Sequence, residues 1–178
     1  MGFTDASALI RFAARLPRDN MLGWGLREQA EFKVRVLPPS AATRLDIDTP
    51  TDLVALRWHP DTPPILRSYL IERLPRPLLD RWKAAAQVLD TPARQIALIG
   101  RVSPNVWQAL QYNTEVWIRV FSEEQGMTAS GRLGGGRIQS LLANYMEHVG
   151  QAAVFKQLGE IVDAAFFDTR VYLAHNGQ

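Results

Sequence analysis

The chain has 178 residues, of which 47% are hydrophobic and 21% are charged, and its formal net charge is +2. These values are ordinary for a globular protein with one medium-sized domain or two small ones. The sequence contains no cysteine, which excludes disulfides, thiolate nucleophiles and cysteine-based zinc sites and fits a cytoplasmic protein. The weak net charge argues against a nucleic-acid partner, and the absence of a long apolar run argues against a membrane-spanning segment.

Residues 1–44 predict two helices followed by one strand. Apolar residues at helical spacing predict helices over about residues 5–16 and 19–30. Apolar and basic residues alternate over Phe32–Leu37, which predicts a strand with one exposed face.

Two aspartates, Asp46 and Asp48, come next in the chain with one apolar residue between them. In an extended strand their carboxylates point to the same side, and Ile47 points into the core. Such a pair of oxygen ligands suits Mg²⁺, which proteins hold with one or two carboxylates plus substrate phosphates. We therefore treat Asp46 and Asp48 as candidate metal ligands.

The same corner also carries a strong helix-start signal. Thr49 is a good N-cap, Pro50 suits the first helical position, and Asp52 is placed to reach back to the cap. The alternative to a metal site is therefore a structural helix start with solvated carboxylates beside it.

The segment FKVRVLP at 32–38, a loop, and LDIDTPTDL at 45–53 together resemble the C-terminal end of the MobA-like nucleotidyltransferases. That group includes the molybdenum-cofactor and 2-phospho-lactate guanylyltransferases. In the family, an Asp/Asn-x-Asp/Asn-Thr-Pro-x-Asp-Leu motif closes the nucleotide site and helps to hold the catalytic metal. The resemblance implies Asp48 as the better Mg²⁺ ligand, Asp46 as its neighbour, and a nucleoside triphosphate or nucleotide-sugar as the ligand.

The family also carries a glycine-rich loop that cradles the triphosphate and a further metal-binding aspartate, both N-terminal to this motif. Residues 1–44 are too short to supply the several βα units that hold them. We therefore expect the chain to be the C-terminal part of a longer protein, inactive in nucleotidyl transfer on its own. Whether it acts as an enzyme stays open.

The rest of the chain predicts two connecting helices and then a small α/β unit. A proline-rich break at 59–64 is the best domain boundary. The expected domains are a transferase-like part (residues 1–60), a helical connector (residues 61–92) and an α/β module (residues 93–178). The expected helices and strands lie at residues 65–74 (helix), 77–89 (helix), 96–99 (strand), 103–110 (helix), 116–121 (strand), 138–149 (helix), 151–163 (helix) and 165–173 (strand, breaking at Asp168). This order predicts a Rossmann-like α/β fold, with a mostly parallel sheet and helices on both faces.

The loop at 122–137 is the second candidate site. It follows a predicted parallel strand and opens a helix, and open α/β sheets bind ligands at that edge. Glycines there let backbone N–H groups turn toward an anion, and arginines can hold a phosphate bidentately. The candidate anion-binding residues are Gly131, Arg132, Gly134, Gly135, Gly136 and Arg137. Asp168 to Arg170 could complete the rim, and Glu123 or Glu124 could form a salt bridge with one of the loop arginines.

Other catalytic schemes find little support. Arg137 and Ile138 replace the Lys and Ser/Thr of a P-loop, and the three histidines lack metalloprotease spacing. Three interpretations remain. The first is a nucleotidyltransferase-related protein that binds a Mg²⁺-nucleotide or another phosphate-bearing small molecule. The second is a non-enzymatic module that binds an anionic ligand or a protein partner through the 122–137 loop. The third is a structural fragment whose exposed sheet edge pairs with a second copy in a homodimer.

Overall fold

A computed structural model describes residues 6–14, 22–28, 32–33, 35, 37–38, 40, 45–47, 49–127 and 130–177. The helices and strands are α1 (Ala6–Ala13), α2 (Leu22–Glu28), α4 (Pro50–Trp58), α5 (Pro64–Arg73), α6 (Arg76–Leu89), β1 (Gln95–Gly100), α7 (Pro104–Asn113), β2 (Trp117–Ser122), α8 (Leu141–Val149), α9 (Gln151–Ile161), β3 (Ala164–Phe167) and α10 (Arg170–His175).

The sheet has three parallel strands in the order β2-β1-β3, with Ile96 of β1 beside Ile118 and Ala164 of its neighbours. Every residue of β1 after Gln95 is buried. A short apolar run of this kind is expected for a strand that is covered on both faces. The predicted α/β class and parallel sheet are confirmed.

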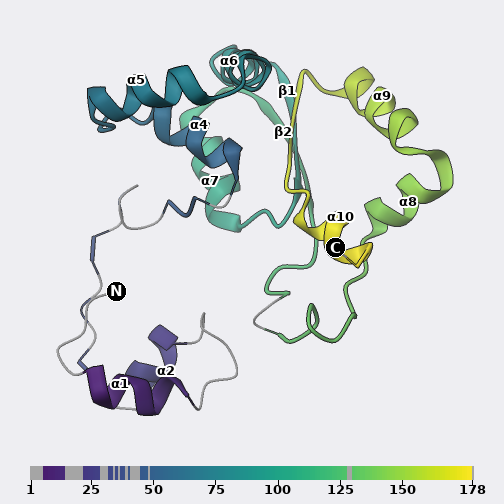
Figure 1. The fold of residues 1–178 in the computed structure, drawn as a ribbon. Helices are drawn as coiled ribbons and strands as arrows, with labels where there is room; N and C mark the ends of the chain where they lie inside the picture. Colours follow the sequence, from purple (N-terminus) through teal and green to yellow (C-terminus); the bar gives the residue numbers. More distant parts are fainter. Residues whose placement is uncertain are drawn as a thin grey trace.

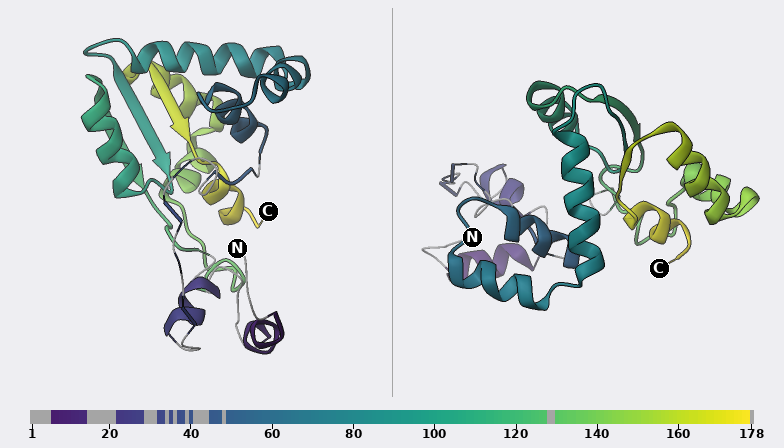
Figure 2. Two further views of the ribbon diagram at one scale, coloured as in Figure 1. Left: turned by 90° about the vertical axis from the view of Figure 1, so that its left-hand side faces the viewer. Right: turned by 90° about the horizontal axis from the view of Figure 1, so that it is seen from above.

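The helices cover both faces of the sheet. α7 connects β1 to β2, whereas α8 and α9 connect β2 to β3, which lies on the opposite side of β1. Parallel crossovers are right-handed, so connections running in opposite directions leave their helices on opposite faces. Figures 1 and 2 show this arrangement, with α6 and α7 on one face of the sheet and α8 and α9 on the other.

A separate helical core lies beside the sheet. Its buried members come from α4, from α5 and the residue that follows it, and from α6, and they are Val54, Leu70, Leu74 and Leu79. The turn between α4 and α5 is fixed by the buried Thr62, whose hydroxyl donates to the carbonyl of Leu56 at 2.5 Å. This core joins residues from both sides of the proposed boundary at 60/61, and the domain division stays a prediction.

The N-terminal part differs from the sequence-based expectation. The described residues between 32 and 37 form no strand, while Val34 and Val36 lie outside the described residues. Ile47 is 49% exposed instead of buried. The described sheet is built from residues after 94, and the described residues of this N-terminal segment are not part of it.

The helices show no candidate for a membrane span. Among the residues that the structure describes, none belongs to a helix long and apolar enough to cross a bilayer.

Candidate functional site

The carboxyl ends of β1 and β3 are in close backbone contact. The N–H of Asp168 donates to the carbonyl of Ile99 at 2.9 Å, one residue beyond the last residue of β3. Gly100 has φ +104°, and a Cβ built there would lie 2.7 Å from the carbonyl oxygen of Asp168. Only glycine fits at this point without displacing the neighbouring strand end.

Asp168 holds two arginines at this edge. Arg101 donates from Nε to Oδ2 at 3.0 Å, and Arg170 donates from Nε to Oδ1 at 2.7 Å and from a terminal nitrogen to Oδ2 at 3.0 Å. The side chains of Arg101 and Asp168 are 25% and 19% exposed, so the pair is shielded from bulk water. Burial alone would raise the pKa of Asp168, but the hydrogen bonds from Arg170 and Arg101 outweigh it and lower the pKa below its ordinary value.

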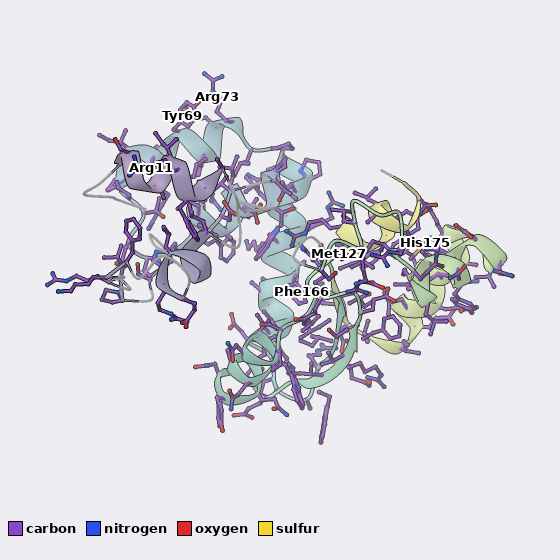
Figure 3. The ribbon with its side chains drawn as sticks, turned by 90° about the horizontal axis from the view of Figure 1, so that it is seen from below. Arg11, Tyr69, Arg73, Met127, Phe166 and His175 are labelled. Carbon is purple, nitrogen blue, oxygen red and sulfur yellow. The ribbon has the colours of Figure 1, made fainter. Side chains whose placement is uncertain are left out.

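A cleft of about 600 Å³ opens beside this cluster, between α6 and the sheet. Its wall is largely apolar, with Trp82 from α6 and Phe166 from β3 (labelled in Figure 3) among the lining side chains. Among the described residues, three arginines line it (Arg81, Arg101 and Arg170) together with one carboxylate, that of Asp168. The cleft therefore combines an apolar wall with several guanidinium groups.

The cleft lies where the strand order predicts a ligand site. In doubly wound sheets that begin with the order 2-1-3, ligands bind outside the carboxyl ends of β1 and β3. The signal for Arg101 was present in the sequence, because a polar residue follows the buried strand directly. Asp168 and Arg170 are among the residues predicted for this edge, whereas Arg101 is not.

The loop at 122–137 is stabilised by its own contacts. Arg132 forms an ion pair with Glu124, donates to Ser130 Oγ at 2.9 Å and donates to the carbonyl of Gln125 at 3.1 Å. The predicted salt bridge between a glutamate and a loop arginine is thus confirmed. An anion at Arg132 would have to compete with these partners.

The glycines of this loop form successive turns. The N–H groups of Gly135, Gly136 and Arg137 donate to carbonyls of Gly131, Leu133 and Arg132 at 2.9–3.1 Å. These donors are therefore used within the loop. Anion binding by Gly131, Arg132, Gly134, Gly135, Gly136 and Arg137 stays a prediction.

The base of the loop is anchored by a partly buried polar network that was not predicted from the sequence. Glu123 accepts hydrogen bonds from the hydroxyl of Ser140 at 2.5 Å and from the N–H of Leu141 at 3.0 Å. Nδ1 of His175 accepts from the N–H of Ser140 at 3.3 Å. Met127 packs nearby on α10, and Figure 3 labels Met127 and His175 at this junction. Glu123 thus caps α8, where a negative charge suits the helix dipole.

The two candidate metal ligands are placed only in part. Asp46 is exposed and Asp48 lies outside the described residues. The helix start is confirmed, because the N–H and hydroxyl of Thr49 both donate to Oδ2 of Asp52 at 2.7 Å. Within the described ranges, no three His, Cys, Asp or Glu side chains gather into a group that could hold a metal. Asp46 is thus the only predicted ligand that the structure places, and a Mg²⁺ site stays a prediction.

Comparison with known proteins identifies no relative. No protein-family model matches the chain, and no curated protein or solved structure matches it either.

Proposed function

We propose that this chain binds a phosphate-bearing small molecule of about nucleotide size in the cleft between α6 and the carboxyl edge of β1 and β3. The observation that carries the proposal is the placement of Arg101 and Arg170 on one shared carboxylate inside that cleft. The shared carboxylate orients both guanidinium groups at the mouth of the cleft.

The geometry of Arg101 supports an anionic ligand. Its Nε donates to Asp168, which fixes the plane of the guanidinium group. No described residue accepts a hydrogen bond from its terminal nitrogens. Those nitrogens form a planar fork that matches two oxygens of a phosphate or carboxylate. Partial burial strengthens such a contact, because water screens it less than at the open surface.

The remainder of the cleft supports a ligand with an apolar or planar portion. Its volume of about 600 Å³ falls within the range of small-molecule sites, about 300–1,000 Å³. Trp82 and Phe166 offer aromatic surface for a base or another flat group. Inorganic phosphate alone should therefore bind more weakly than a nucleotide.

A second candidate function is the nucleotidyltransferase-related one, in which the bound species is a Mg²⁺-nucleotide. The observation in its favour is that Thr51, in the first turn of α4, lines the same cleft. The corner that resembles the MobA-like transferases therefore lies beside the arginine cluster. In this version Asp46 and Asp48 would supply carboxylate ligands to Mg²⁺, and transfer would need residues that precede this corner.

Isothermal titration calorimetry of ATP, GTP and inorganic phosphate, each with and without Mg²⁺, tests both candidates. We expect saturable nucleotide binding that weakens at least about tenfold in Arg101→Ala, the loss of one charge-assisted contact of about 1.5–3 kcal/mol. Arg94→Ala is the matched control, because Arg94 forms an ion pair of similar length with Asp163 (2.9 Å) at the opposite edge of the same sheet.

The variants also separate the candidates. Binding that requires Mg²⁺ and is lost in Asp48→Ala would support the transferase-related function. Binding that is lost in Arg132→Ala combined with Arg137→Ala, but kept in Arg101→Ala, would place the anion on the loop at 122–137 and refute the cleft. Absence of saturable binding for every ligand at millimolar concentration would refute both.

A further inference from the structure

The outer edge of β2 has unused hydrogen-bonding groups. The N–H groups of Trp117 and Glu123 donate toward β1, to the carbonyls of Arg94 (2.7 Å) and Gly100 (3.1 Å). Because successive residues of a strand point their backbone groups to opposite sides, those of the alternate residues 118, 120 and 122 point outward. No strand in the described part of the chain pairs with this edge.

The side chains along this edge are apolar and exposed. Trp117, Val120 and Phe121 of β2 are 67%, 41% and 38% exposed. The adjacent helix α7 contributes Trp107, which lines a groove of about 280 Å³ together with Val120. An exposed and largely apolar edge strand is a template for association, and natural proteins usually protect such an edge.

The exposed apolar surface beside this edge favours association. The apolar side chains concerned are each between 38% and 67% exposed, and they are Trp107, Trp117, Val120 and Phe121. With side-chain areas of about 150–250 Å² for the aromatic members, they present roughly 400 Å² per copy. A standard interface buries about 800 Å² per partner, and the backbone of the paired strand and the polar side chains beside it would add to the apolar area.

We propose that β2 pairs antiparallel with β2 of a second copy, about a two-fold axis perpendicular to the sheet. The axis lies midway between the two copies of Val120, so that each Val120 is directly opposite the other. With Val120 on the axis, Ile118 lies opposite Ser122 of the second copy. All outward backbone groups of the strand are then paired.

The charges favour the same register. Arg119 then lies opposite Phe121 of the second copy, so its aliphatic stem packs on an aromatic ring. An axis through Arg119 would instead place two guanidinium groups opposite each other, which is destabilising. An axis through Phe121 would leave the outward groups of Ile118 without a strand partner. The product is one continuous six-stranded sheet, and the cleft at β1 and β3 stays open in each copy.

Sedimentation equilibrium at several protein concentrations tests the association. We expect the mass of a dimer for the unchanged chain, and the mass of a monomer for Val120→Lys, which brings two ammonium groups together on the axis. Ile65→Lys is the control, since Ile65 is 87% exposed on α5, away from the edge, and it should leave the dimer intact. Circular dichroism should show that both variants fold.

Disulfide trapping tests the register, because the chain has no cysteine of its own. Hydrogen-bonded antiparallel pairs have Cα atoms about 5.5 Å apart, within the disulfide range. Val120→Cys should therefore cross-link under mild oxidation. Ile118→Cys should not cross-link alone, because the two copies of residue 118 lie roughly 13 Å apart along the strand, but it should cross-link with Ser122→Cys.

Two results would overturn the proposal. One is a monomeric mass for the unchanged chain at every concentration up to about 100 µM, a dissociation constant weaker than most specific complexes. The other is cross-linking of Ile118→Cys alone at the rate of Val120→Cys.

Discussion

Replacing Gly100 by alanine should weaken the whole carboxyl edge of the sheet. The backbone there has φ +104°, which an L-residue adopts at a cost of about 1–2 kcal/mol. The new Cβ would lie 2.7 Å from the carbonyl oxygen and 2.9 Å from the Cβ of Asp168, so the two strand ends must separate. Separation strains the bond between the N–H of Asp168 and the carbonyl of Ile99, which contributes about 1 kcal/mol.

These contributions add to a loss of about 2–3 kcal/mol in the free energy of unfolding. Urea unfolding followed by circular dichroism measures it, with Gly159→Ala as the control. Gly159 lies within α9, with open space where a Cβ would be, so alanine there should stabilise the protein by about 0.5–1 kcal/mol. A Gly100→Ala variant as stable as the unchanged chain would show that the strand ends do not meet as described.

Two further predictions concern polar side chains. Asp168→Asn should lose about 2 kcal/mol of stability at neutral pH. Because the pKa of Asp168 is lowered in the folded state, its contribution is present above the ordinary value of 3.8 and disappears as the pH falls through the lowered pKa. Unfolding free energies of the two proteins should thus converge in acid, and a constant difference would contradict this. Ser140→Ala should lose about 1–2 kcal/mol, because the buried hydroxyl caps α8 and donates to Glu123. Ser103→Ala should lose less in the same urea titration, since its cap on α7 is longer and exposed; equal losses would contradict the role of the network.

The sequence predicted those elements whose signals are local. Thr49 and Pro50 begin α4, Ser103 caps α7, and Gly150, with φ +87°, separates α8 from α9 as expected. The apolar run of β1 and its short crossover to β2 also predicted a parallel pair, because both features depend on residues close together in the chain. The expected break of the last strand at Asp168 coincides with the end of β3, but the residues after it, expected to be strand, form helix α10.

The errors concern contacts between distant parts of the chain. Trp107 and Trp117 lie in apolar stretches of a predicted helix and strand but are 42% and 67% exposed, because an apolar residue does not by itself indicate whether a partner covers it. The ion pair of Arg101 with Asp168 joins residues 67 positions apart. Spacing within a segment cannot reveal such a pair; only the order of strands in the sheet brings the two ends together.

Helix α6 contributes side chains both to the helical core and to the wall of the cleft. Leu78 and Trp82 pack against the helical core formed with α4 and α5, and the same two side chains form a wall of the cleft. Damage to the helical core would therefore also change the wall of the cleft, and with it the affinity for the proposed ligand, without removing a direct contact to that ligand. A substitution on the far side of α6 that lowers the affinity would do so by weakening the packing that supports this helix, and not by removing a ligand contact. The melting temperature of the variant would distinguish these two effects.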